Sequence, residues 1–313
     1  MKKQLLWFTK QLEAENRILL QATPISMATT ANVYHLTLKS DREILEAFVK
    51  CPPETENEWM VCKYIYPFIP EFTPQLLGIY EEGKHRAILL LDESVPEKSS
   101  NKHTTDLNLY HNTNDEWITD ALPLVLRMHL ECSSYTEHWL QAGWTSILQP
   151  YKLEPWRTRG LTALEEAYQT GQSPIEIEWL NQPRLWSYIN ETYQGRTTWT
   201  HGDLHRGNWV HSRRGWLLID WAYAYVSTPY RDMAMLLSEA ANLHAACSLW
   251  SNYVTNMKEA GWKLEEKFFL LSLVDHVVMM IGFLHLTEND PAKNEKMQHY
   301  MSLLMELEKA AAE

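Results

Sequence analysis

The stretch that most constrains the fold of this chain is residues 201–208, His-Gly-Asp-Leu-His-Arg-Gly-Asn, followed by an apolar run that ends at Asp220. Two short β-prone runs, residues 209–212 and 216–219, flank Arg-Arg-Gly, which is a hairpin signal. Such a hairpin brings Asn208 and Asp220, just outside its two ends, close together in space. The two glycines of the preceding loop give its backbone the freedom to curl around an ion.

Asp203, Asn208 and Asp220 carry the oxygen atoms that a phosphoryl transfer needs. This chemistry requires a carboxylate that accepts or orients the proton of the attacking hydroxyl, and hard oxygen ligands that hold Mg²⁺ on the nucleotide phosphates. Asp203 suits the first task. Asn208 offers a neutral carbonyl oxygen, and Asp220 offers a carboxylate at the end of a run that reads as a buried strand. A His-Gly-Asp tripeptide alone indicates only a polar turn, and it is the combination with Asn208 and Asp220 that is specific.

That combination resembles the catalytic and metal-binding segments of the aminoglycoside phosphotransferase and choline kinase superfamily, which are relatives of the protein kinases. Their pattern is H-G-D-x-x-x-x-N followed by an apolar strand ending I-D-[FW], and every constrained position is present here. The resemblance implies that Asp203 is the catalytic base, that Asn208 and Asp220 are Mg²⁺ ligands, and that His201 braces the loop. Arg206 stands where many members carry proline, at a position that is not a ligand.

The N-terminal part has the pattern of a small sheet with one helix before it. The spacing of apolar residues predicts an amphipathic helix over residues 2–20 that packs on the sheet. Strands are predicted over residues 33–38, 44–50, 75–80 and 86–91. In the resembled family a loop between the first two strands covers the nucleotide phosphates and ends in Ser-Asn-x-Val-Tyr or similar. Asn32 and the Val-Tyr after it match that ending, while small residues replace the expected glycines in residues 26–31 and can still cradle phosphate.

Lys50 ends the predicted strand over residues 44–50. The resemblance implies that this lysine reaches the α and β phosphates and is positioned by a glutamate of the next helix, predicted over residues 54–66. Glu58 is the favoured partner, and Glu56 remains open. From this segment alone, a solvent-facing lysine at a strand end is an equally good interpretation. The glutamates would also suit an acidic helix N-terminus without any further role.

After residue 91 the chain becomes polar and rich in turn-forming residues, which predicts a boundary. In kinase-like folds this place is the hinge, so the resemblance implies that backbone groups from Leu91 to Glu93 meet the adenine edge. We predict an N-terminal nucleotide-binding lobe over residues 1–93. The C-terminal catalytic and acceptor-binding lobe is then predicted over residues 94–313.

The C-terminal part is predicted to be mainly helical. Helices are predicted over residues 115–130, 232–259, 264–287 and 291–312. The first of them ends in Leu-Arg-Met-His, which is similar to the family's helix end before the acceptor region. Residues 229–234, Pro-Tyr-Arg-Asp-Met-Ala, resemble the family's Pro-x-x-Asp-Leu-Ala. This resemblance implies that Asp232 starts a helix and braces the catalytic loop by hydrogen bonding.

Tryptophans are frequent in the region that shapes the acceptor pocket in the resembled family. They are Trp139, Trp144, Trp156, Trp179, Trp186 and Trp199. Aromatic residues usually serve core packing, although indole faces also attract ammonium groups. The chain carries 40 acidic against 28 basic residues, a formal net charge of -12. This balance argues against nucleic acid as a partner and is compatible with a cationic acceptor.

The four cysteines form no Cys-x-x-Cys pair, which predicts free thiols in a reducing compartment. The N-terminus has no signal-peptide core, and the most apolar helix, around residues 268–286, contains Asp275 and His276. We therefore expect a cytoplasmic protein with no membrane-spanning helix and no membrane partner.

The fold class implied by the resemblance is a two-lobed, protein-kinase-like α+β architecture. The implied function is transfer of the γ-phosphoryl group of ATP or GTP, with Mg²⁺, to a hydroxyl group of a small molecule. Aminoglycoside-like, macrolide-like and choline-like alcohols are the candidate acceptors. The alternative is a non-catalytic structural protein of the same fold, similar to spore-coat-associated relatives. The missing glycines favour that alternative, and the intact Asp203, Asn208 and Asp220 oppose it, because a scaffold needs none of them.

Overall fold

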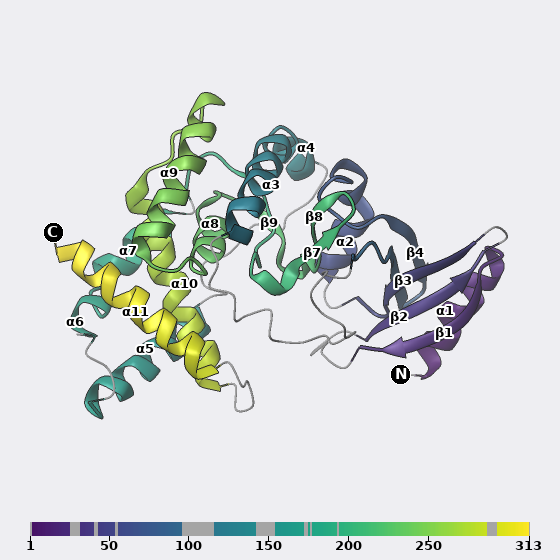
Figure 1. The fold of residues 1–313 in the computed structure, drawn as a ribbon, viewed down its shortest axis with the longest axis horizontal. Coiled ribbons are helices and arrows are strands. Elements are labelled where there is room, and N and C mark those ends of the chain that lie inside the picture. The colour runs from purple at the N-terminus through teal and green to yellow at the C-terminus, as the bar shows by residue number, and fades with distance from the viewer. Residues whose placement is uncertain are drawn as a thin grey trace. The chain divides into compact units, whose positions relative to one another are not determined.

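A computed structural model of the chain describes residues 2–25, 32–40, 43–53, 56–95, 116–141, 154–171, 175, 177–192, 194–286 and 293–312 (Figure 1). Contacts group the chain into two compact units. The first unit is Met1–Thr104 with Asn208–Ala224, and the second is Thr105–Gly207 with Tyr225–Glu313. The lobe boundary at residue 93 stays a prediction, and the contacts place the segment that contains the predicted hairpin with the N-terminal residues.

A five-stranded antiparallel sheet, in the order β1-β2-β3-β5-β4, forms the first unit. The strands are β1 (Ile18–Pro24), β2 (Val33–Lys39), β3 (Ile44–Lys50), β4 (Leu76–Glu82) and β5 (His85–Leu91). Helix α1 (Lys2–Ala14) packs on this sheet as predicted, with Phe8 and Leu12 fully buried beside the strand residues Leu36 and Val49. Residues alternate between buried and partly exposed along β2, so one face of the strand supplies the core.

The predicted helix over residues 2–20 is wrong beyond Ala14. The chain turns at Asn16, which has a left-handed φ of 58°, and enters β1 at Ile18. Asparagine tolerates this backbone region better than most residues. Leu19 and its neighbours form an edge strand instead of continuing the helix. As a strand they pair with residues Lys39 to Tyr34 of β2 through backbone hydrogen bonds.

The predicted hairpin is present as β7 (Trp209–Ser212) and β8 (Gly215–Leu218), with Ser212 paired to Gly215 across a two-residue turn. Gly215 has a φ of 101°, which a side chain would strain. The first unit also contains α2 (Glu56–Tyr64) and the short 3₁₀ helices η1 (Tyr66–Phe68) and η5 (Trp221–Tyr223). The ring of Tyr66 meets that of Trp221 edge-on at 6.3 Å, which joins these elements around the end of the hairpin.

The second unit is mainly helical. Its helices are α3 (Glu116–Ser133), α4 (Thr136–Gln141), α5 (Glu154–Gln169), α6 (Ile177–Leu180), α7 (Pro183–Glu191), α8 (Tyr230–Leu237), α9 (Leu243–Glu259), α10 (Glu266–Leu286) and α11 (Lys293–Ala312). In the two-stranded ribbon of β6 (Thr198–Thr200) with β9 (Tyr225–Ser227), β6 leads into the loop of residues 201–208, which ends in the 3₁₀ helix η4 (Arg206–Asn208). The helix predicted over residues 232–259 is two helices, because Asn242 caps α9 by accepting a hydrogen bond from Ala245 N.

Helix α10 is apolar around its whole circumference because it lies within the helical unit, against α5, α8 and α11 (Figure 1). It crosses α5 closely at two glycines: a Cβ atom on Gly160 would lie 1.9 Å from Val278 O, and one on Gly282 would lie 2.6 Å from Trp156 O. The helix runs without interruption through Asp275 and His276. By length and composition it could span a membrane, contrary to what Asp275 and His276 predicted, but most of its apolar stretch is buried inside the protein.

Candidate active site

The loop after β6 is the first part of the candidate site. Gly202 has a left-handed φ of 79°, which lets the chain turn sharply between His201 and Asp203. His201 is fully buried, and its Nδ1 accepts a hydrogen bond from Asp203 N at 3.3 Å. The carboxyl group of Asp203 is partly exposed. The loop therefore exposes the Asp203 carboxylate to solvent, while buried groups hold the backbone of the loop in place.

Asp232, in the first turn of α8, supplies that fixation. Its Oδ2 accepts from His201 N and its Oδ1 from Gly202 N, each at 2.8 Å. The predicted brace is thus confirmed. The sequence did not show that His129 and Tyr253 complete it: His129 Nε2 lies 3.1 Å from Asp232 Oδ2, and His129 Nδ1 lies 2.8 Å from the Tyr253 hydroxyl oxygen.

The side chains of Glu239 and His205 hold the far end of the loop. Glu239 Oε1 accepts a hydrogen bond from Arg206 N at 3.0 Å, and burial raises the pKa of Glu239. His205 Nδ1 accepts from Gly207 N at 3.0 Å, so in the neutral ring the proton sits on Nε2. That Nε2 lies 3.4 Å from Asp203 Oδ2. His205 lies within the sequence motif of residues 201–208, whereas no sequence pattern marked Glu239 as part of the site.

In the first unit, the hairpin brings the segments of the two predicted metal ligands together. Ile219 N donates to Asn208 O at 3.0 Å, so the residue before Asp220 is bonded to Asn208. Asp220 has a φ of 62°, one of two left-handed non-glycine residues in the described part of the chain. Such a conformation is unfavourable for most residues and is kept mainly where function needs it. The side chain of Asn57 in α2 supports the turn by donating to Ala224 O at 2.5 Å.

Lys50 connects β3 to this turn. Its Nζ donates to Glu58 Oε1 at 2.5 Å and to Asp220 Oδ1 at 3.0 Å. Burial alone would lower the pKa of Lys50, but the carboxylates of Glu58 and Asp220 outweigh burial and raise it above the usual value. The ammonium group therefore stays charged at neutral pH and lies between a buried carboxylate on α2 and the carboxylate after β8.

Among the glutamates of α2, the structure pairs Lys50 with Glu58, while the Glu56 carboxylate pairs with Arg86. Glu58 is buried and Glu56 is largely exposed, which explains the choice: Glu58 faces the sheet and Glu56 faces solvent. The role of this pair toward a nucleotide stays a prediction. Burial also raises the pKa values of Cys62 in α2 and Tyr66 in η1.

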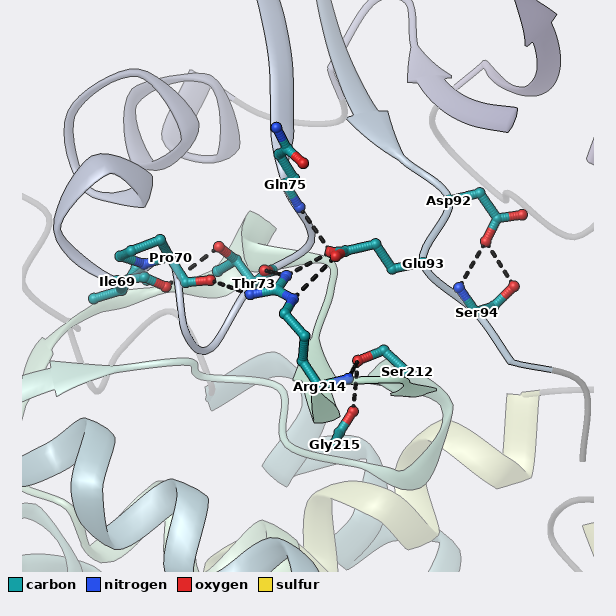
Figure 2. A network of polar contacts seen from close by, with 10 residues as sticks. All are labelled: Ile69, Pro70, Thr73, Gln75, Asp92, Glu93, Ser94, Ser212, Arg214 and Gly215. Atoms are coloured by element: carbon teal, nitrogen blue, oxygen red, sulfur yellow. Dashed lines mark hydrogen bonds and ion pairs between the residues drawn. The ribbon is translucent and has the colours of Figure 1, made fainter. Parts of the chain in front are cut away.

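The other predicted nucleotide contacts lie at strand ends. Asn32 O accepts from Cys51 N at 3.0 Å, which holds Asn32 beside the end of β3, while residues 26–31 of the predicted phosphate loop lie outside the described residues. Leu91 N donates to Gln75 O at 2.9 Å. The Glu93 carboxylate pairs with Arg214 and accepts from Gln75 N, so its side chain is committed to protein contacts (Figure 2).

The tryptophans that the structure describes are partly core residues. Trp139 and Trp199 are buried and meet edge-on at 5.3 Å between ring centroids, and the guanidinium of Arg157 stacks over Trp186 at 4.6 Å. Trp144 lies outside the described residues. Packing therefore accounts for at least these rings.

The described residues contain no group of three or more His, Cys, Asp or Glu side chains that could hold a metal ion by themselves. Asn208 and Asp220 still fit a magnesium ion, because both offer hard oxygen atoms on adjacent, hydrogen-bonded segments. Two protein ligands are few, as is usual for Mg²⁺ that shares its coordination with phosphates and water.

A five-stranded sheet unit, a helical unit and a braced His-Gly-Asp loop define a phosphotransferase with a kinase-like fold. The model of the phosphotransferase enzyme family matches residues 21–250, and the chain belongs to that family. The resemblance drawn from residues 201–208 and 220 is thereby confirmed. No curated protein sequence matches the chain.

Several solved structures share the fold of this chain at low sequence identity. The choline kinase LicA from Streptococcus pneumoniae has a TM-score of 0.54 and 12% identity, over 96% of this chain and 98% of that chain. The macrolide 2'-phosphotransferase MphH from Brachybacterium faecium has a TM-score of 0.53 and 13% identity, over 95% and 97%. The spectinomycin phosphotransferase APH(9)-Ia, solved with ADP and spectinomycin, has a TM-score of 0.57 and 11% identity, over 98% of each chain.

Proposed function

We propose that this protein transfers the γ-phosphoryl group of ATP, or of GTP, to a hydroxyl group of a small molecule. The observation that carries the proposal is the Lys50–Glu58 ion pair, whose lysine also contacts Asp220, in a chain that keeps Asp203 and Asn208. A scaffold would not need a buried lysine between two carboxylates, since such charges are costly to desolvate. The non-catalytic alternative is therefore not favoured.

In the proposed reaction, the oxygen of the acceptor hydroxyl bonds to the γ-phosphorus, and Asp203 accepts the proton of that hydroxyl. The bond from that phosphorus to the β–γ bridging oxygen breaks, and the nucleoside diphosphate leaves with the electron pair. Lys50 contacts the α and β phosphates, and Glu58 orients Lys50. Asn208 and Asp220 would hold Mg²⁺, which neutralises phosphate charge when it is bound.

Several features of the fold suit this division of roles. The left-handed turn at Asp220 and the bond between Ile219 and Asn208 fix the proposed metal ligands relative to each other. The Asp232 brace fixes the backbone on which Asp203 stands. Positioning of this kind supplies much of the catalysis in phosphoryl transfer, because the protein contributes little covalent chemistry.

The direct test is a panel of small-molecule alcohols incubated with the protein and either MgATP or MgGTP. The panel contains aminoglycosides, macrolides, choline-like amino alcohols and sugars. Mass spectrometry then detects the addition of one phosphoryl group to an acceptor. The absence of any product and of nucleotide hydrolysis, for a folded protein across a broad panel, would contradict the proposal and favour the structural alternative.

Metal dependence tests the roles of Asn208 and Asp220. We expect ATP to stabilise the protein against heat only with Mg²⁺ or Mn²⁺, because two oxygen ligands cannot hold the triphosphate without a metal bridge. Thermal-shift measurements with ATP, with and without divalent ion and EDTA, check this. Full stabilisation in EDTA would exclude the assigned metal role.

A cationic acceptor is the favoured subclass, since the formal net charge is -12 and an acidic site steers cations. One structure with the same fold is a choline kinase, and choline carries a quaternary ammonium group. The tryptophans give less support, because Trp139 and Trp199 are used in packing. The idea is tested by the panel: a best acceptor that is neutral or anionic, or whose affinity does not depend on ionic strength, would contradict it.

A further inference from the structure

The segment that follows β5 runs beside the β7–β8 hairpin. Residues 91–95, which we call the hinge segment, contain the backbone groups predicted to meet the base of the nucleotide. Ser94 forms a β-bridge with Ser212, and Val95 N donates to His211 O at 3.0 Å. A single β-bridge with its backbone hydrogen bond thus attaches the hinge segment to the hairpin.

Arg214, at the tip of the hairpin, adds a side-chain connection to the same segment (Figure 2). Its Nε donates to Glu93 Oε1 at 3.0 Å and its Nη2 to Glu93 Oε2 at 2.5 Å, which makes the pair bidentate. Glu93 Oε2 also accepts from Gln75 N at 3.0 Å. The planar guanidinium matches a carboxylate in this fork geometry, and lysine cannot reproduce it.

The same guanidinium fixes a third segment. Arg214 Nη1 donates to Pro70 O at 2.9 Å and Nη2 to Thr73 O at 3.0 Å. These carbonyls lie in the connection between η1 and β4, and Leu218 N in β8 donates to Phe72 O at 2.7 Å. Arg214 and Glu93 also line a pocket together with Pro70, Thr73 and Gln75.

The hairpin therefore has a different task at each end. Its tip holds the hinge segment through Arg214, and its base is flanked by Asn208 and Asp220. We propose that Arg214 and Glu93 form a clamp that positions the hinge segment for the nucleotide base, with the hairpin of the metal ligands as its support. This inference rests on the proposed function, and it makes Glu93 a positioning residue whose carboxylate serves Arg214.

The clamp should strengthen binding of the nucleotide base and have no effect on binding of the triphosphate. The contacts that organise the triphosphate end, Lys50 with Glu58, Lys50 with Asp220 and Ile219 with Asn208, do not include Arg214 or Glu93. Loss of the clamp leaves them intact. A general loss of folding would instead weaken every ligand alike.

The experiment uses the full chain and four variants: Glu93→Gln, Arg214→Met, the double variant and Arg214→Lys. Calorimetry gives the dissociation constant of MgATP, and displacement gives that of magnesium tripolyphosphate, which has no base. We expect each single variant to bind MgATP about tenfold more weakly, the loss typical of a charge-assisted hydrogen bond. Tripolyphosphate binding should be unchanged. The double variant should lose no more than either single one, because the partners act together.

Arg213→Ala is the matched control, because Arg213 is the exposed neighbour of Arg214 in the same turn, and it should bind both ligands as the parent does. The MgATP affinity of Arg214→Lys should lie between those of the parent and Arg214→Met, because lysine keeps the charge and loses the fork geometry. Unchanged MgATP binding in the single variants, or an equal loss for MgATP and tripolyphosphate, would overturn the clamp alone. A parent protein that binds neither ligand would overturn the proposed function and the clamp together.

Discussion

Lys50 and Asp203 stand on supports of opposite character. Around Lys50, in the first unit, the contacts are ionic: one ammonium group lies between the carboxylates of Glu58 and Asp220. Around the loop of Asp203, in the second unit, one fully buried carboxylate, Asp232, receives backbone N–H groups and the ring of His129. An ionic support can exchange its partners for phosphates and metal, whereas a buried hydrogen-bonded support keeps one geometry.

Substitution of the reacting carboxylate should give the largest effect. Asp203→Asn should lower the turnover rate by about 10² to 10⁴, the usual cost of losing a positioned general base, while MgATP binding stays near the parental value. Single-turnover kinetics and calorimetry measure the two quantities. Circular dichroism must show that the variant is folded. A folded variant that turns over at the parental rate would show that Asp203 is not the base.

Removal of the buried carboxylate of Asp232 should lower the stability of the folded protein and not only its turnover rate. Asp232→Ala leaves His201 N and Gly202 N without their acceptor and removes one of the two partners of His129, so we expect a loss of about 3 kcal/mol in the free energy of unfolding. Urea denaturation measures this loss. Asp120→Ala is the control, because that carboxylate is exposed on α3. Equal stability of Asp232→Ala and the parent would refute the brace.

The ionic support should show its effect in ligand binding. Lys50→Met should weaken MgATP binding about tenfold, because a charge-assisted contact is lost. Glu58→Gln keeps a hydrogen-bond acceptor for Lys50 and should weaken binding less. Calorimetry on both variants compares them. A greater loss with Glu58→Gln than with Lys50→Met would mean that Glu58, and not the lysine, is the group that matters for the nucleotide.

The two regions should also differ in their response to pH. Burial, together with Arg231 and His205 and against the opposing effect of Asp203, lowers the pKa of His276 in α10 to about 3. Below about pH 6.5, His276 is protonated in the unfolded chain and stays neutral in the folded protein. The free energy of unfolding should therefore fall by about 1.4 kcal/mol for each unit that the pH is lowered. Above that pH the contribution is fully present. Lys50 has a raised pKa, so its contribution is lost only in strong alkali.

Urea denaturation of the parent and of His276→Gln between pH 7 and pH 5 measures the acid effect. On acidification the free energy of unfolding should fall less for the variant than for the parent, and the difference should be about 1.4 kcal/mol per pH unit below about pH 6.5. His244→Gln is the control, because His244 is exposed. Identical slopes for the parent and His276→Gln would mean that His276 is not held neutral in the folded protein.

Much of the site was available from the sequence because its parts are local. Residues 201–208, the hairpin signal and Asp220 lie within twenty residues of each other, and short-range turn chemistry brings Asn208 and the segment of Asp220 together. Asp232 was also predicted, since it lies in a recognisable motif at a helix start. Alternation of apolar and polar residues predicted β2, because one face of that strand is buried.

Only the tertiary structure decided what depends on partners far along the chain. The choice of Glu58 over Glu56 follows from which side of α2 faces the sheet, and the pairing of Glu93 with Arg214 joins residues 121 positions apart. The left-handed turn at Asp220 had no sequence signal. The end of α1 at Ala14 was decided by the edge of β2, which stabilises β1 through hydrogen bonds that helical periodicity in a single segment does not reveal.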